Sequence, residues 1–273
     1  MIDLHCHLLP GIDDGAADEA TSLEMARIAA ADGIRVVACT PHIYPGLYEN
    51  DAAGIRARTR ALQRRLHEEG IALALDVGAD LHLTPELLGR LRSKTAPTIA
   101  GSRYFLLEPP HTVAPPRFAE TVFDFVAAGY VPVVTHPERL SWIGRHYELF
   151  TQLVRSGVWM QVTAGSLVGR FGRRAKSVAE RMLDDGLVHL LATDAHGTRH
   201  RAPLLAEGRL AAEKRVGAEE ARRLVVDRPQ AILDDRPPGE VPAVPLLAID
   251  GRGKHAARRP GFLGRLVGRP RRP

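Results

Sequence analysis

Short apolar segments alternate with segments of helical periodicity through most of this chain, and this alternation limits the folds that it can adopt. The apolar segments are 2–5, 34–40, 71–78, 104–107, 131–135, 158–162 and 187–193. The helical segments between them are 20–31, 55–69, 85–92, 118–128, 147–155 and 175–185. Parallel strands need crossover connections, which are usually helices. The strands are rich in Val, Ile and Leu without strict alternation, as is typical of strands covered by helices. We therefore predict an α/β fold, a closed or nearly closed TIM-like (βα)7 barrel.

Three regions follow from the distribution of helices, proline and charge. Two further helices are predicted at 202–215 and 218–226, so that the barrel domain covers 1–234. Residues 235–250 form a proline-rich linker, and 251–273 form a basic tail that we expect to be disordered.

The net charge points to different partners once it is divided by position. The formal charge of +5 suggests a nucleic-acid partner, but eight arginine or lysine residues and no acidic residue follow Asp250. The rest of the chain has 29 basic and 32 acidic residues, so we predict no nucleic-acid partner. The tail is predicted either to contact an anionic membrane or an acidic partner weakly, through Phe262, Leu263, Leu266 and Val267, or to touch nothing.

The cellular compartment is predicted from the absence of a signal peptide, a membrane span and a disulfide framework in the sequence. The opening residues MIDLHCH have neither the basic nor the apolar region of a signal peptide, and no apolar run reaches the roughly 18 residues of a membrane span. Two cysteines, Cys6 and Cys39, are too few for a disulfide framework or a thiolate zinc site. We expect a cytoplasmic protein.

Imidazole and carboxylate groups recur where the predicted strands end. The carboxyl ends of the strands share one mouth in a parallel barrel, so these groups should converge there. The nine residues are His5, His7, Asp14, His42, Asp80, Glu108, His136, Asp194 and His196. Nitrogen and oxygen donors without a thiolate suit manganese, iron, zinc or cobalt. One ion cannot use nine donors, whereas three ions can share them through bridging carboxylates.

Each of these residues also has a simpler interpretation when it is taken alone. His-x-His on a strand can be a surface or core pair, and Asp14 before glycine is typical of a turn. Glu108 can form an ordinary ion pair, and Asp194 can cap a helix. All of these interpretations would have to hold independently at successive strand ends, so the metal cluster is favoured.

Four motifs carry a resemblance to a known family. They are MIDLHCHLLPGIDDGA (1–16), TPH (40–42), HPER (136–139) and TDAH (193–196). They resemble the polymerase and histidinol phosphatase (PHP) superfamily. Within it the chain is most similar to the bacterial manganese-dependent tyrosine-protein phosphatases of capsule and exopolysaccharide operons (CpsB/CapC type), over residues 1–234. The resemblance implies a distorted PHP-type barrel of seven βα units that holds three divalent ions, with manganese preferred over iron, zinc or cobalt.

The resemblance also implies a role for each motif residue. The first ion would be held by His5, His7, Asp80 and Asp194. Asp80 would bridge to a second ion, held also by Glu108 and His136, and the third would be held by Asp14, His42 and His196. Arg139 and Arg201 match the phosphate-binding arginines, whose planar fork donates two parallel hydrogen bonds to phosphate. Each arginine can alternatively be a solvated surface residue. His42 and Asp194 are candidates for proton transfer.

Two positions depart from the family pattern. Asp80 stands where the family usually has Glu and is shorter by one methylene, about 1.5 Å. A bridging role for Asp80 therefore requires backbone movement or a weaker second ion. Cys6 replaces a small hydroxyl residue, and because its side chain alternates away from His5 and His7 we predict a buried, unreactive thiol.

The resemblance implies hydrolysis of phosphotyrosine on a bacterial tyrosine kinase that regulates capsule or exopolysaccharide synthesis. A PHP phosphoesterase acting on a small phosphomonoester such as histidinol phosphate remains the alternative. Cysteine phosphatases are excluded, since Cys-x5-Arg would need arginine at Ile12 or Pro45. An amidohydrolase usually needs a lysine within the barrel, and no lysine ends a predicted strand. A binding module with structural metal would show no metal-dependent turnover.

Overall fold

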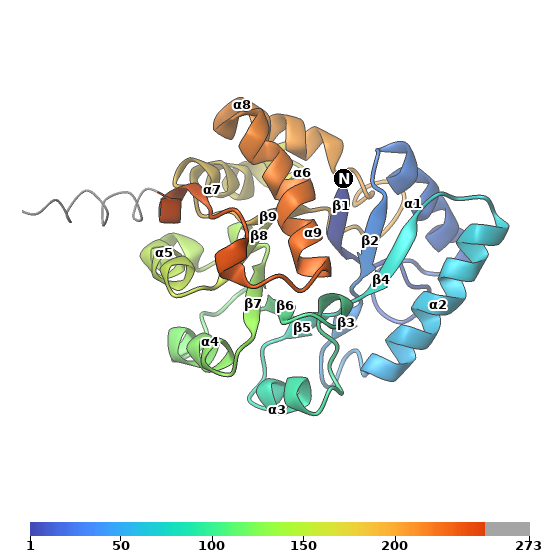
Figure 1. The fold of residues 1–273 in the computed structure, drawn as a ribbon, viewed down its shortest axis with the longest axis horizontal. Coiled ribbons are helices and arrows are strands. Elements are labelled where there is room, and N and C mark those ends of the chain that lie inside the picture. The colour runs from blue at the N-terminus through green and yellow to red at the C-terminus, as the bar shows by residue number, and fades with distance from the viewer. Residues whose placement is uncertain (249–273) are drawn as a thin grey trace, which may run out of the picture.

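Residues 1–248 form an α/β barrel built from nine short strands, all of them parallel. The computed structural model describes residues 1–248 (Figure 1). The strands are β1 (Ile2–Cys6), β2 (Val36–Cys39), β3 (His42–Ile43), β4 (Ala74–Val77), β5 (Asp80–His82), β6 (Tyr104–Glu108), β7 (Val131–Thr135), β8 (Trp159–Thr163) and β9 (Leu190–Ala192). They form one sheet of order β1-β2-β4 and a second of order β3-β5-β6-β7-β8-β9.

The nine strands occupy seven positions, because β2 and β4 are each followed, after a two-residue interruption, by a short strand, β3 or β5, that lies beyond the predicted strands 34–40 and 71–78. β2 and β3 are separated by Thr40 and Pro41, and a proline cannot donate a backbone hydrogen bond to the ladder. β4 and β5 are separated by Gly78 and Ala79. Backbone bonds cross the interruption, from Gly78 N–H to the Cys39 carbonyl (3.0 Å) and from Asp80 N–H to the Pro41 carbonyl (3.1 Å). The two sheets are therefore continuous through bent strands.

The barrel closes between its first and last strands. The Asp194 N–H donates to the His5 carbonyl (2.8 Å), and the His7 N–H donates to the Ala195 carbonyl (2.9 Å). Below them the buried carboxylate of Asp3 accepts from the Thr193 N–H (3.0 Å). The predicted distorted seven-unit barrel is confirmed.

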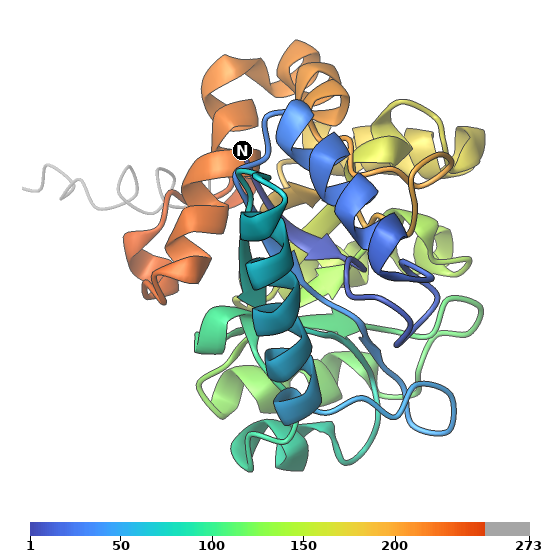
Figure 2. The same ribbon diagram turned by 90° about the vertical axis from the view of Figure 1, so that its right-hand side faces the viewer.

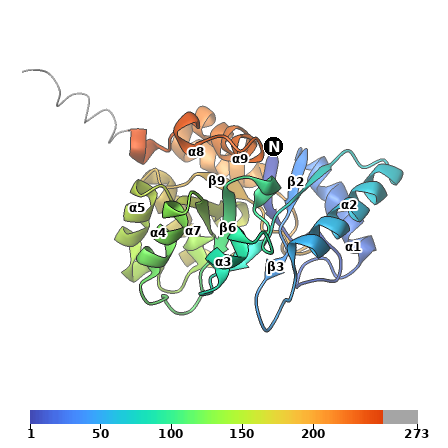
Figure 3. The same cartoon turned by 60° about the horizontal axis from the view of Figure 1, so that its bottom comes forward.

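Helices cover the outside of the barrel (Figures 1 and 3). They are α1 (Glu19–Ala31), α2 (Ala52–Glu68), α3 (Leu87–Arg92), α4 (Phe118–Ala127), α5 (Tyr147–Arg155), α6 (Ala164–Leu167), α7 (Gly172–Asp184), α8 (Ala206–Arg222) and α9 (Arg228–Leu233). Aspartate caps start the first two, since Asp18 accepts from the Thr21 N–H (2.8 Å) and Asp51 from the Gly54 N–H (2.7 Å). Gly33 at φ 88° turns the chain from α1 into the next strand.

The end of the barrel domain differs from its prediction in detail. α8 is interrupted at Gly217 (φ 82°), which matches the break between the two predicted helices. A π-helical turn, Arg223–Asp227, then leads into α9, which was not predicted. The side chain of Arg228 is fully buried and donates to the carbonyls of Pro242 (2.8 Å) and Ala243 (3.0 Å). Residues 241–244 of the proline-rich segment therefore lie against the barrel.

The predictions for the basic tail, 251–273, lie outside the described residues. Among residues 1–248, no helix combines the length and the apolar character that crossing a membrane requires.

Candidate metal centre

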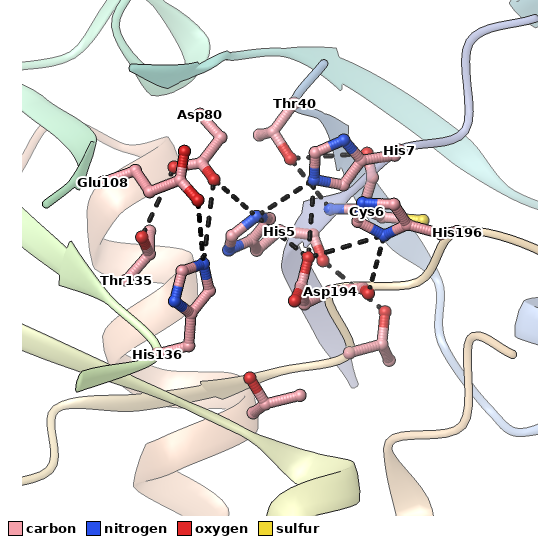
Figure 4. A network of polar contacts seen from close by, with 12 residues as sticks. His5, Cys6, His7, Thr40, Asp80, Glu108, Thr135, His136, Asp194 and His196 are labelled. Atoms are coloured by element: carbon pink, nitrogen blue, oxygen red, sulfur yellow. Dashed lines mark hydrogen bonds and ion pairs between the residues drawn. The ribbon is translucent and has the colours of Figure 1, made fainter. Parts of the chain in front are cut away.

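All nine predicted donors lie at the carboxyl end of the barrel. His5 is on β1 and His7 follows it, and Asp80 and Glu108 are on β5 and β6. His136 follows β7, while Asp194 and His196 follow β9. Figure 2 shows the loops after the strands gathered at one side of the barrel. Figure 4 shows side chains turned toward one another for His5, His7, Asp80, Glu108, His136, Asp194 and His196. Parallel pairing brings them together because every strand points toward the same mouth.

The first group of donors surrounds the Nε2 atom of His5. This atom lies 3.2 Å from His7 Nε2, 3.4 Å from Asp80 Oδ2 and 3.3 Å from Asp194 Oδ1. Donors that share an ion at about 2.1 Å lie about 3.0 Å apart in octahedral geometry and about 3.4 Å apart in tetrahedral geometry. The spacing of this group therefore fits one divalent ion. The other ring nitrogen, His5 Nδ1, lies 2.9 Å from Gln161 Oε1, which orients the imidazole.

A second group lies around Glu108 and Asp80. His136 Nε2 lies 3.8 Å from Asp80 Oδ2 and 3.8 Å from Glu108 Oε1. His42 Nδ1 approaches the same two carboxylates at 3.6 and 3.5 Å. One oxygen of Asp80 therefore faces His5 on one side and His136 on the other, although these contacts are longer than those around His5.

The third group joins Asp14 to two histidines. Asp14 Oδ1 lies 3.3 Å from His196 Nε2 and 3.5 Å from His42 Nε2. His42 thus presents one nitrogen to this group and the other to Glu108 and Asp80. The rings of His7 and His196 lie 3.8 Å apart between centroids, so the first and third groups are in direct contact.

Unpartnered polar atoms provide the test of whether metal ions fit here. Asp80 Oδ2, His42 Nδ1 and His196 Nε2 are buried and have no hydrogen-bond partner among the residues that the structure describes. Buried polar atoms are almost always hydrogen-bonded, because leaving them unpaired costs free energy. All three belong to the donor groups, and the donors are nitrogen and oxygen only. The residues therefore fit divalent ions.

Burial and neighbouring charges keep two of the histidines neutral. Burial, helped by the charge of Arg139, lowers the pKa of His136 to about 3. Burial and His7 lower the pKa of His196 to about 4. A neutral imidazole keeps the lone pair that a metal needs. Burial opposes the ionisation of Asp194, but Arg139 and His5 outweigh it and hold the pKa of that carboxyl well below its usual range.

Two donors stand on unusual backbone. His136 has φ 35° and Asp194 has φ 50°, in the left-handed region that costs a residue with a side chain about 1–3 kcal/mol. The Asp194 conformation is held by its bond to the His5 carbonyl. Such positive φ values are typical of functional sites, where the surrounding structure over-determines the backbone.

The two predicted arginines meet on one carboxylate oxygen. Arg139 and Arg201 both donate to Asp194 Oδ2, the latter at 2.6 Å, while Asp194 Oδ1 faces His5 and His7. The ring of Phe171 lies beside both guanidinium groups, 4.7 Å from Arg139 Cζ and 5.9 Å from Arg201 Cζ. The arginines therefore border the first donor group.

Sequence reasoning missed several neighbours of the donors. Asp13 Oδ2 lies 2.7 Å from His7 Nδ1 and accepts from the His42 N–H at 3.0 Å. His111 Nε2 lies 3.2 Å from Glu108 Oε1, and His82 Nδ1 lies 3.6 Å from Glu108 Oε2. Asp13 could have been found from its place in the motif Asp13-Asp14-Gly15. The contacts of His82, His111, Gln161 and Phe171 have no local signal.

The prediction that the Cys6 thiol is buried is confirmed. Cys6 and Cys39 are both buried and free. Burial raises the pKa of the Cys39 thiol to about 12 and raises that of Cys6 well above its usual range. Neither thiol is a reactive thiolate at neutral pH.

A closed parallel barrel with histidine and carboxylate donors and two arginines at its mouth places the protein in the class of α/β barrels with a candidate metal centre. The chain belongs to the CpsB/CapC family, whose model, described as capsular polysaccharide synthesis, matches residues 1–234.

Curated relatives and a solved structure agree with this family. The tyrosine-protein phosphatase YwqE of Bacillus subtilis (strain 168) is 39% identical over 220 residues, covering 80% of this chain and 86% of YwqE. The tyrosine-protein phosphatase CpsB of Streptococcus pneumoniae is 27% identical over 241 residues, 86% of this chain and 99% of CpsB. A chain from the crystal structures of these two proteins, described as unique metal-dependent tyrosine phosphatases, superimposes with a TM-score of 0.83 at 35% identity, covering 87% of this chain and 96% of that chain.

Proposed function

We propose that this protein is a metal-dependent phosphotyrosine-protein phosphatase. The observation that carries the proposal is the meeting of two chemistries at Asp194, with histidine donors at Oδ1 and two arginines at Oδ2. A phosphoryl group bound at this point would lie between the metal ions that the histidines would hold and the two guanidinium groups. The names of the relatives supply the phosphotyrosine substrate.

The donors would hold three divalent ions, manganese first among the candidates. The first would be held by His5, His7, Asp80 and Asp194, and the third by Asp14, His42 and His196. Asp80, Glu108 and His136 would hold the second, where the contacts are longest. When bound, such ions lower the pKa of water and neutralise charge on phosphoryl oxygens.

The residues of the chain would position the substrate and move protons. Arg139 and Arg201 would donate hydrogen bonds to the phosphoryl oxygens, where charge-assisted bonds favour the transition state over the substrate. The bond from phosphorus to the tyrosyl oxygen breaks as water attacks in line. A tyrosine leaving group has a pKa near 10 and depends less on a strong general acid than a serine would. Inorganic phosphate and tyrosine are the products, so the attacking water loses a proton and the tyrosyl oxygen gains one. We assign this proton transfer to His42 and Asp194.

Hydrolysis of an aryl phosphate tests the reaction. Metal-stripped protein should be inactive and should recover turnover when manganese, iron, zinc or cobalt is added separately. The same samples should hydrolyse a phosphotyrosyl peptide much faster than histidinol phosphate. Full activity after exhaustive chelation would contradict a metal mechanism, and preference for histidinol phosphate would favour the small-molecule alternative.

The His136→Ala variant tests the placement of the second ion. It should lose most turnover, while thermal unfolding shows that the barrel remains folded. His67→Ala is the matched control, because His67 is exposed in the last turn of α2, outside the donor groups. Normal turnover by His136→Ala would remove His136 from the site.

The physiological substrate would be a phosphorylated tyrosine kinase of capsule or exopolysaccharide synthesis, acting with this enzyme in the cytoplasm. The family description supplies the pathway. A purified, autophosphorylated kinase of this kind should lose its phosphotyrosine on incubation with the metal-loaded protein, as read by mass spectrometry. Retention of phosphate on the kinase, alongside turnover of small peptides, would argue for a different partner.

A further inference from the structure

The charge around the mouth of the barrel is divided between two sides. The segments that follow β7, β8 and β9, residues 136–146, 164–176 and 193–205, contain eight arginine and lysine residues. Their two acidic residues, Glu138 and Asp194, are buried. The segments that follow the earlier strands, 7–18, 44–51, 83–86 and 109–117, contain six acidic residues and one basic residue. The cationic side is therefore local and does not reflect the composition of the barrel.

Most of this positive charge lies outside the proposed phosphate site. Apart from Arg139 and Arg201, the cationic residues form a set that we call the basic rim: Arg145, Arg170, Arg173, Arg174, Lys176 and Arg199. Arg145, Arg173 and Arg199 are exposed, and within residues 1–248 their side chains make no ion pair or side-chain hydrogen bond. Three guanidinium groups are thus available to an external anion.

Packing places the basic rim beside the phosphate-binding arginines. Phe171, which contacts Arg139 and Arg201, lies next to Arg170 and two residues before Arg173. Two residues span at most about 7 Å of chain. Arg174 donates to the carbonyls of Leu140 (2.8 Å) and Ser141 (2.9 Å), which fixes the start of α7 against the segment that carries Arg139.

Arg145 lies on the side of the mouth nearest Glu108. It lines a cavity of about 470 Å³ together with Val113, Ser141, Trp142 and His146. The Ser141 N–H donates to the His111 carbonyl (2.8 Å), and the His111 ring reaches Glu108. The wall of this cavity therefore adjoins the segment that holds His111 against Glu108.

We infer that the basic rim selects phosphotyrosine flanked by anionic side chains. The inference rests on the proposed function and names the substrate class of the same site. The anion can be a carboxylate or a second phosphotyrosine, since guanidinium binds both. Opposite charge at a mouth raises the rate of encounter and the affinity, and salt screens the attraction within about 8 Å at physiological ionic strength.

Three phosphotyrosyl peptides test the inference on the metal-loaded, full-length protein. The first has neutral flanks, the second has glutamate on both sides, and the third has neutral flanks with a second phosphotyrosine nearby. At low salt we expect kcat/KM to be about tenfold higher for the second or third peptide than for the first, through KM. The advantage should shrink as sodium chloride is raised to about 0.5 M. The anionic peptide that gains identifies the source of the charge.

Charge-reversal variants assign the effect to the basic rim. Arg145→Glu with Arg173→Glu should remove the advantage of the anionic peptides and leave turnover of a small aryl phosphate unchanged. Arg145→Gln with Arg173→Gln should give an intermediate loss. Arg58→Glu is the matched control, because Arg58 is exposed on α2.

The outcomes separate the two proposals. Equal kcat/KM for all three peptides, or an advantage that survives both double variants, would overturn the role of the basic rim and leave the phosphatase proposal standing. Failure of the metal-loaded protein to hydrolyse any of the peptides would overturn both.

Discussion

Asp13 connects two of the donor groups through a single carboxylate. It pairs with His7 Nδ1 at 2.7 Å and holds the His42 backbone at 3.0 Å, while its other oxygen accepts from the Gly15 N–H. Replacing it removes the partner that orients His7 and loosens the start of β3. We predict that Asp13→Ala weakens metal binding by about 10- to 100-fold.

Titration calorimetry of the metal-free protein with manganese measures this loss of affinity. Asp18→Ala is the control, since Asp18 only caps α1. Unchanged manganese affinity in Asp13→Ala would show that His7 is oriented without this carboxylate.

His7 gives the metal-free site a pH dependence of its own. Burial opposes its protonation, but hydrogen bonds to Asp13 and Asp194 outweigh burial and raise the pKa of His7 to about 10. The protonated ring stabilises the metal-free fold. This stabilisation is fully present below the unfolded pKa of about 6.5 and is lost as the pH rises toward 10. A metal must displace the proton, so its affinity should rise about tenfold per pH unit between pH 7 and 9.

Calorimetry in buffers of different ionisation enthalpy counts the protons released on metal binding. At least one proton per first ion is expected at pH 7.5. Affinity that is independent of pH, without proton release, would contradict a protonated His7.

At the scale of elements, α8 packs so closely on α6 that one position admits only glycine. A Cβ built on Gly208 would lie 2.5 Å from Ala164 Cβ and 2.8 Å from Ala164 Cα. We predict that Gly208→Ala destabilises the protein by about 1–3 kcal/mol, although alanine is the better helix former.

Gly89→Ala is the matched control for this prediction. Gly89 lies in α3 with nothing within 4 Å of an added Cβ, so the change should stabilise by up to about 1 kcal/mol. Urea unfolding compares the two variants. Equal effects would show that helix propensity, and not the contact with Ala164, decides at Gly208.

At the scale of the whole molecule, the end of the described chain is part of the packed structure. Val241 and Val244 are buried, and Arg228 uses the carbonyls of Pro242 and Ala243 while it pairs with Glu220 at 2.7 Å. We predict that a chain shortened to residues 1–234 loses about 3 kcal/mol and roughly 6–12 °C in Tm, because two valines and a buried guanidinium lose their cover.

A chain shortened to residues 1–250 should retain the Tm and the aryl phosphate turnover of the full protein. Differential scanning calorimetry and the aryl phosphate assay compare the three lengths. A fully stable 1–234 protein would support the domain boundary predicted at residue 234, and a large loss in 1–250 would give 251–273 a role in the active fold.

Much of the barrel was predictable, because its signals are local. The crossover helices and the apolar strands follow from periodicity, and Gly217 marks a break that the structure retains. β3 and β5 were not predicted, since these short strands lie beyond the predicted strands 34–40 and 71–78 and depend on pairing with each other. α9 was not predicted because one of its buried residues is Arg228. Arginine usually lies at the surface, so the sequence shows no apolar helical face there.

Local sequence signals alone were enough to predict the class of fold and the candidate donors. Parallel strands must end at a common mouth, so residues such as His5 and Glu108 converge whatever the details of packing. Three features followed only from the folded chain: which candidate donors are neighbours, that Asp194 faces histidines and arginines with different oxygens, and that positive charge gathers beside β7 to β9. These features depend on contacts between residues far apart in the chain, and no local pattern encodes those distances.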